Sequence, residues 1–250
     1  MVAGRKDEEW LLFELPVTDY MEAWNLQRAL VAGIVCGRIH HNVILSLQHS
    51  SVFTLGRSSG RESLRVSENV LEKSGIPLVQ TERGGSITFH GPGQLVVYPI
   101  INLEAFGIRV GEYVYRLEEA MIRTAADWNI SAERNRLNAG VWVGRNKLGS
   151  VGLTIRHGIS FHGLALNISN SLQAFSWINP CGLNGVGVTS IERELSRDVS
   201  FHTARRHMMR HIEEVFDVRL VRTDMAELQN VLDGSPSKGA CVTVSGGGKR

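Results

Sequence analysis

The placement of glycine is the feature of this sequence that most constrains its fold. Glycine makes up 26 of the 250 residues, against about 7% in average proteins, and the excess is concentrated in a few runs between β-like segments. Because glycine lacks a side chain, such runs let two backbones, or a backbone and a ligand, approach closely. The runs are residues 83–94, 140–152, 160–167 and 178–182.

The first run lies between a β-like segment, residues 77–81, and the clearest buried strand, residues 94–101. It contains neither of the phosphate-binding glycine signatures, GxGxxG or GxxxxGK[ST]. Spacing alone therefore leaves two interpretations open, a ligand-binding loop and a tight structural hairpin.

Hydrophobic periodicity predicts helices that pack against a sheet. Asp19 and Glu22 cap an amphipathic helix over about residues 20–34, and residues 112–128 also have apolar positions at helical spacing. Over residues 130–168, short segments rich in Val, Ile and Leu alternate with glycine, which is typical of antiparallel or mixed sheet. Further expected elements are strands at 42–48, 52–55 and 218–221, a short helix from Ser67 to near Gly75, and helices at 198–216 and 224–232.

This pattern indicates one α/β domain, a mixed β-sheet flanked by helices, over residues 10–233. Roughly 250 residues can share a single core, and neither an internal repeat nor a Pro-rich linker divides the sequence. Residues 234–250 are rich in Gly, Ser and Lys, so we expect them to form a disordered tail.

Charge and hydropathy exclude several classes of protein. Lys and Arg number 27 and Asp and Glu 25, a net charge of +2, so no basic block predicts a nucleic-acid partner. The longest apolar stretches fall far short of the ~20 residues that span a bilayer, so we expect no membrane partner. The charged residues 5–9 do not resemble a secretory signal, and Cys36, Cys181 and Cys241 form no CxxC pair. We predict a cytoplasmic protein, and we expect neither a metal nor a cofactor.

Three side chains are candidates for chemistry. Lys147 is the only lysine between residues 73 and 238, and a buried lysine can exchange a proton whereas arginine cannot; the alternative is a solvated lysine beside a hairpin turn. Cys181 lies between a proline and a glycine, which can hold a thiol exposed on a sharp turn; the alternative is a buried, inert thiol. His162, taken alone, is more typical of a hydrogen-bonded structural histidine.

Taken together, these segments resemble the lipoyl(octanoyl) transferase family, the octanoyl-acyl carrier protein:protein N-octanoyltransferases. They occur in the family's order over residues 45–189, and the joint match is far more specific than any single run. The matching segments are FTLGR at 53–57, RGG at 83–85, HGPGQ at 90–94, GVWV at 140–143, KLGSVG at 147–152, HGLALN at 162–167 and NPCG at 179–182. Residues 135–139, which precede the GVWV segment, lack the Pro or Thr that is common at this place in the family.

The resemblance implies a fold similar to the catalytic domain of lipoate and biotin protein ligases. It also implies a reaction, the first step of endogenous protein lipoylation, in which an octanoyl group leaves its thioester and becomes an amide on a lysine. The implied donor is octanoyl-acyl carrier protein. The implied acceptors are the lipoyl domains of 2-oxoacid dehydrogenase complexes and the glycine cleavage H protein.

The resemblance also assigns roles to residues. It implies that Cys181 takes up the acyl group as nucleophile and that Lys147 lowers the pKa of this thiol and moves protons. Such a pair is chemically sound, because the thiolate is the nucleophile and an adjacent cation favours it. His90 and His162 are expected to shape the pocket and to hydrogen-bond within it. The implied substrate-binding residues are Arg83, Gly84, Gly85, Ser86, Ile87, Thr88, Phe89, His90, Ser150, Val151, Gly152, Gly163, Leu164 and Ala165.

Three other functions compete with this one. An ATP-dependent lipoate ligase on the same fold would need a nucleotide-binding lysine loop and no acylated cysteine. A Cys-His hydrolase would use His162 or His90 as base and would release free octanoate. A carrier-binding module without enzymatic activity would keep Cys181 as a structural residue.

Overall fold

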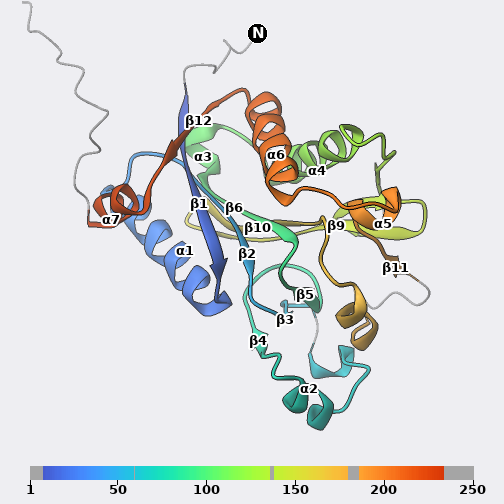
Figure 1. Ribbon diagram of the computed structural model, residues 1–250. Helices are drawn as coiled ribbons and strands as arrows, with labels where there is room; N and C mark the ends of the chain where they lie inside the picture. The colour runs from blue at the N-terminus through green and yellow to red at the C-terminus, as the bar shows by residue number, and fades with distance from the viewer. Residues whose placement is uncertain (1–7, 59, 136–137, 180–185, 234–250) are drawn as a thin grey trace, which may run out of the picture.

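A large mixed sheet forms the centre of the computed structural model, which describes residues 8–58, 60–135, 138–179 and 186–233 (Figure 1). Within these residues the sheet has nine strands. Strands β12, β1 and β2 run parallel, and the path from β2 through β6, β10, β9 and β8 to β7 is antiparallel. In spatial order the strands are β12 (Arg219–Thr223), β1 (Glu9–Thr18), β2 (Val43–His49), β6 (Gln94–Asn102), β10 (Ile159–Asn167), β9 (Asn146–Arg156), β8 (Gly140–Val143) and β7 (Glu133–Arg134), with β11 (Gly187–Val188) beside β9.

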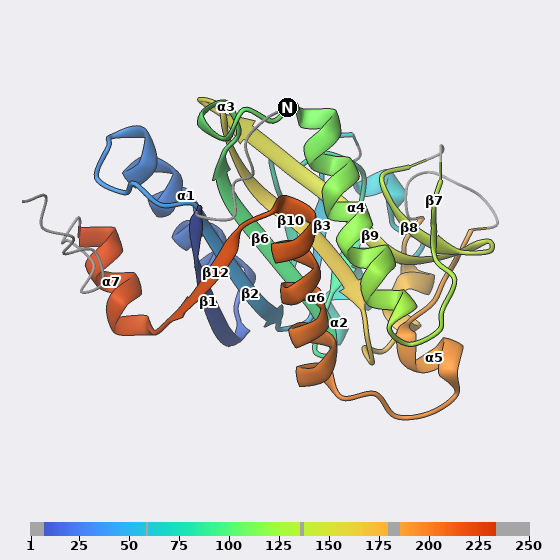
Figure 2. The same cartoon turned by 90° about the horizontal axis from the view of Figure 1, so that it is seen from above.

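Helices cover both faces of this sheet (Figure 2). Helices α1 (Tyr20–Val35) and α7 (Met225–Asp233) lie on one face, and α3 (Leu103–Phe106), α4 (Val110–Ala126) and α6 (Phe201–Phe216) lie on the other. Alternate residues of β1 enter the two cores, Leu11 and Phe13 beside α1 and Trp10 and Leu12 beside α6. The expectation of a mixed sheet flanked by helices is confirmed.

A second, three-stranded sheet joins the first beside β9. It consists of β4 (Leu78–Gln80), β3 (Val52–Leu55) and β5 (Thr88–His90), and it packs near η1 (Arg61–Ser63), α2 (Glu68–Ser74) and η2 (Gln173–Trp177) around its own apolar core. The first glycine run connects the two sheets, because the Gly84 N–H donates to Leu153 O of β9 while the Arg57 N–H donates to Arg83 O. A short helix, α5 (Ile191–Leu195), follows β11.

The structure agrees with most of the expected elements and corrects some of their limits. Asp19 caps α1, and its side chain accepts hydrogen bonds from the N–H groups of Met21 (2.8 Å) and Glu22 (3.2 Å). The helix expected from residue 198 begins only at Phe201, because Ser200 supplies the N-cap. Strand β1 was not anticipated. Its residues 10–13 are all buried, so they lack the alternation that marks a half-exposed strand.

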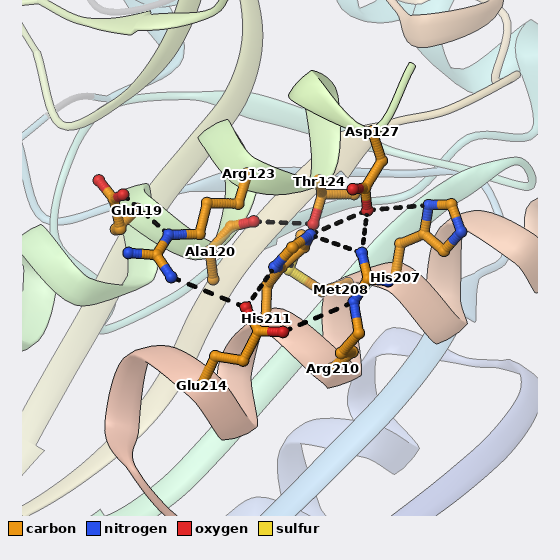
Figure 3. Close-up of polar contacts among 10 residues, drawn as sticks. All are labelled: Glu119, Ala120, Arg123, Thr124, Asp127, His207, Met208, Arg210, His211 and Glu214. Atoms are coloured by element: carbon orange, nitrogen blue, oxygen red, sulfur yellow. Dashed lines mark hydrogen bonds and ion pairs between the residues drawn. The ribbon is translucent and has the colours of Figure 1, made fainter. Parts of the chain in front are cut away.

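Helices α4 and α6 are joined by a polar cluster centred on Asp127 (Figure 3). One carboxylate oxygen, Oδ2, accepts hydrogen bonds from Arg210 (2.6 Å) and His211 (2.8 Å) and lies 3.0 Å from Nδ1 of His207. The other ring nitrogen of His211 lies 3.0 Å from Glu214 Oε2. Burial by itself would raise the pKa of Asp127, but the His211 hydrogen bond and the charges of His211, Arg210 and His207 hold this pKa below its ordinary value.

The substitution Asp127→Asn is expected to lower the free energy of unfolding near neutral pH by about 1 kcal/mol. A carboxyl with a depressed folded-state pKa stabilises the fold above its unfolded pKa of about 3.9, and this contribution is lost as the pH falls through the folded pKa. Urea unfolding should therefore show a difference from the parent protein at neutral pH that is lost as the pH falls through the depressed folded-state pKa of Asp127. Asp198→Asn, at an exposed position, is the control. An equal loss in both variants would contradict the assignment.

Candidate active site

The first three glycine-rich segments, residues 83–94, 140–152 and 160–167, line one cavity beside the N-terminal end of α1. Its volume is about 790 Å³, including the open mouth. All the substrate-binding residues implied by the resemblance line it, except Phe89. The Phe89 side chain instead packs in the core of the small sheet, with ring centroids 5.2 Å from Phe53 and 5.6 Å from Phe175.

Close backbone contacts explain two glycines of the segments that match the family. A Cβ atom on Gly56 would lie 2.2 Å from Gly85 O, and one on Gly163 would lie 2.3 Å from Val97 O. Neither contact is possible for a real side chain, so the small sheet closes onto the first glycine run, and β6 onto β10, only with glycine at these positions.

Arg83 anchors the loop that forms one wall of the cavity. Its side chain is only 7% exposed. It donates to Thr54 O (2.6 Å), to Thr54 Oγ1 (2.9 Å from Nη2 and 3.1 Å from Nε) and to Gly84 O (3.1 Å). The planar guanidinium thus fixes β3 and the glycine run to each other.

Lys147 is a buried lysine that lines the cavity, with 6% of its surface exposed. Its Nζ donates to Asn138 Oδ1 at 2.7 Å and lies 5.3 Å from the centroid of the Trp142 ring. The loop that carries Asn138 is held in turn by α4, because Glu118 Oε1 accepts from the Gly140 N–H at 2.8 Å. The structure therefore rules out a solvated lysine at a hairpin turn.

Cys181, the nucleophile implied by the resemblance, lies outside the described residues. The described residues on either side of residues 180–185 are held by backbone contacts. Before them, the Asn179 N–H donates to Ser63 O at 2.8 Å, and after them Val188 pairs with Lys147 as part of β11.

A hydrogen-bond network links the segments that match the family. His90 Nδ1 lies 2.7 Å from Gln94 Oε1, and Gln94 Nε2 donates to Asn167 Oδ1 at 2.9 Å. Asn167 Nδ2 donates to Thr189 O, and the Thr189 N–H donates to Lys147 O. The predicted hydrogen-bonding role of His90 is therefore confirmed, and this network ties three distant segments to the backbone of Lys147.

Rings from five elements, α1, β2, β5, β6 and β10, pack at the other end of the cavity. They belong to Tyr20, Trp24, His49, His90, Tyr98 and His162, with neighbouring centroids 5.1–6.3 Å apart. His49 Nδ1 donates to Thr18 O, so its Nε2 accepts from the Tyr98 hydroxyl at 2.7 Å. Burial lowers the pKa of His49 to about 4. For His162, burial together with the charges of Arg83 and His49 lowers the pKa to about 3.

Sequence reasoning missed several residues that line the cavity. Gln94 and Asn167 lie inside matching segments, so their position was a usable signal. Tyr20, Tyr98 and Asn138 carry no local signal, because they reach the cavity only through the packing of α1, β6 and the loop before β8. Within the described residues, no group of three or more His, Cys, Asp or Glu side chains is placed to hold a metal ion.

Comparison with known proteins assigns this chain to a family. Residues 19–213 match the lipoyl protein ligase A/B catalytic domain. The chain belongs to this family. An octanoyltransferase of Desulfotalea psychrophila is 45% identical over 207 residues, which are 82% of this chain and 93% of that protein. One of Syntrophobacter fumaroxidans is 40% identical over 222 residues, 89% of this chain and 97% of that protein.

Solved structures agree with this family assignment at the level of the fold. A bipartite lipoate protein ligase of Thermoplasma acidophilum has a TM-score of 0.68 with 16% identity and 90% coverage of both chains. A lipoate-protein ligase A bound with ATP also has a TM-score of 0.68 and 16% identity, covering 90% of this chain and 92% of that one.

The resemblance to the lipoyl(octanoyl) transferase family and the expectation of an acyltransferase are confirmed. A binding module without enzymatic activity is excluded. In the part of the chain that the structure describes, no helix combines the length and apolar character needed to cross a bilayer.

Proposed function

We propose that this acyltransferase moves an octanoyl group from octanoyl-acyl carrier protein to the lysine of a lipoyl domain through a thioester on Cys181. The observation that carries the proposal is Lys147, a buried lysine in a cavity lined by the first three glycine-rich segments. The octanoyltransferase relatives at 40–45% identity support the choice of acyl group. The proposed catalytic unit comprises residues 10–233, in a cytoplasmic protein.

The cavity suits a medium-length acyl chain. Val151, Leu164, Ala165 and Ile87 contribute apolar lining. Burial of each CH₂ group is worth ~0.8 kcal/mol, so an octanoyl chain gains several kcal/mol of binding. In this proposal the acyl chain lies along β9 and β10, with its thioester at the end of the cavity that holds Lys147.

The proposed chemistry has two steps that share one proton carrier. In the first, the Cys181 thiolate attacks the thioester carbon, the bond to the carrier sulfur breaks, and the Lys147 ammonium protonates the departing thiolate. In the second, the acceptor lysine attacks the Cys181 thioester, and the neutral Lys147 amine accepts the proton that this nitrogen loses. The products are an amide on the acceptor and a regenerated Cys181 thiolate beside a Lys147 ammonium.

The histidines of the cavity are poor candidates for this proton transfer. A general base is most effective when its pKa is near the working pH, but burial and the charges of Arg83 and His49 lower the pKa of His162 to about 3. Burial, with the charges of His49 and Arg83, also places the pKa of His90 well below its ordinary value. This favours the lysine mechanism over a Cys-His hydrolase.

The test is to incubate the protein with octanoyl-acyl carrier protein without an acceptor and to record intact mass with peptide mapping. An octanoyl adduct on Cys181 is expected, and a lipoyl domain should discharge it as octanoyl-lysine. Cys181→Ser should lose the adduct, whereas Cys36→Ser, at an exposed free cysteine, should keep it.

Other outcomes of this experiment would support the competing functions. Transfer without an adduct would mean that the acceptor attacks the donor directly. Release of free octanoate in place of octanoyl-lysine would indicate a hydrolase. Transfer from free octanoate and ATP would indicate a ligase, whose fold this chain shares.

A further inference from the structure

His162 is a buried side chain whose ring nitrogens lack a hydrogen-bond partner among the described residues. It lines the cavity, is 1% exposed, and neither ring nitrogen has a hydrogen-bond partner in the part of the chain that the structure describes. A neutral imidazole has one donor and one acceptor, and both are normally satisfied when buried. The predicted role of His162 as a hydrogen-bonded residue is therefore not fulfilled by this chain's own described residues.

The backbone at His162 directs this ring toward the cavity. Its φ is +56°, in the left-handed region that non-glycine residues rarely occupy. In a regular strand, His162 and Phe161 would point to opposite faces of the sheet. Here their rings stack with centroids 5.0 Å apart, and the backbone N–H of His162 donates to Gln27 Oε1 of α1 at 2.7 Å. Strained backbone of this kind is typical of functional positions.

Two α1 side chains next to His162 also have polar atoms without a partner among the described residues. Gln27 is fully buried, and its Nε2 has no partner among the described residues. Trp24, whose ring centroid is 6.2 Å from that of His162, has a buried Nε1 that is also without a partner among those residues. We call Trp24, Gln27 and His162 the His162 chamber. Buried polar groups that lack protein partners usually bind ordered water.

The strand register places the His162 chamber far from Lys147. His162 pairs with Leu153 of β9. At about 3.3 Å per residue, the Cα atoms of Lys147 and Leu153 are about 20 Å apart along the strand. Ser150 and Gly152, which also line the cavity, lie between them. An acyl chain whose thioester is at Lys147 therefore points its methyl end toward the His162 chamber.

We propose that the His162 chamber binds ordered water and thereby sets the upper limit of acyl chain length at this site. This inference rests on the proposed function, because it takes the thioester to lie at the Lys147 end. A chain longer than octanoyl would displace the water and leave the polar atoms of His162, Gln27 and Trp24 unpaired. That loss outweighs the gain from burying another methylene group. An octanoyl chain stops short of the water and avoids this loss.

The test compares acyl-enzyme formation from hexanoyl, octanoyl, decanoyl and dodecanoyl thioesters of acyl carrier protein. His162→Leu removes the polar atoms and keeps an apolar side chain, and it should raise the ratio of dodecanoyl to octanoyl rates at least about tenfold. His162→Asn keeps a donor and an acceptor and tolerates the left-handed backbone, so its ratio should stay near that of the parent. His40→Leu, at an exposed position, is the control for the introduction of a leucine.

Trp24→Phe covers the case in which His162→Leu does not fold. It removes one donor of the chamber and keeps an aromatic ring, so it should shift the ratio in the same direction by a smaller factor. An unchanged ratio in the folded chamber variants would overturn the proposal and leave the proposed function intact. If the parent protein forms no adduct with any of the four donors, the proposed function fails and this inference fails with it.

Discussion

Lys147→Arg is expected to lower the rate of octanoyl transfer by about 100- to 10,000-fold, the usual contribution of general acid-base catalysis. Arginine keeps the positive charge but does not release a proton in proteins. The alkylation rate of Cys181 by iodoacetamide should therefore fall much less than turnover. Steady-state transfer and thiol alkylation, measured on the same preparation, separate the proton-transfer role from the charge.

Three further variants sharpen this prediction. Lys147→Met removes the charge as well, so both alkylation and transfer should fall. Lys73→Arg, at an exposed position of α2, should leave both rates unchanged. Asn138→Ala keeps the lysine and removes its 2.7 Å acceptor, so we expect an intermediate loss of transfer. Turnover of Lys147→Arg near that of the parent protein would refute the proton-transfer role.

Arg83→Lys is expected to lower the free energy of unfolding by about 2–3 kcal/mol, because hydrogen bonds from a charged donor contribute ~1.5–3 kcal/mol each. The Arg83 guanidinium bonds Thr54 O, Thr54 Oγ1 and Gly84 O at once. A single ammonium cannot reproduce this planar arrangement. The loop that forms a wall of the cavity should then shift, and transfer should fall with stability.

Urea unfolding and the transfer rate, measured together, check this prediction. The matched control is Arg156→Lys. Arg156 forms an ion pair with Glu82 at 2.6 Å, but its side chain is 47% exposed, so the change should be below about 0.5 kcal/mol. Equal small losses in the two variants would show that the Arg83 hydrogen bonds do not anchor the loop.

Patterns local in the sequence predicted much of the fold. The cap at Asp19 and the helical spacing of residues 112–128 act over one or two turns, so they indicated α1 and α4 before any tertiary contact was known. Strand β1 was missed for the opposite reason. Its continuous apolar run becomes interpretable only when β12 and β2 are placed on either side of it.

The residues of the candidate site also include some that the sequence predicted and some that only the structure revealed. The matching segments and their order carried the resemblance to the family, and this resemblance implied the residues between Arg83 and Ala165 that line the cavity. Phe89 was an exception, because strand alternation turns it away from the cavity and into the core of the small sheet.

The tertiary structure decided what surrounds the chemistry. Asn138 meets Lys147 only because α4 holds the neighbouring Gly140 through Glu118. His162 enters the cavity because its backbone adopts a positive φ, which no sequence pattern predicts. Periodicity and capping are properties of neighbouring residues and can be read along the chain. The partners of a buried polar atom come from distant segments, and only folding brings them together.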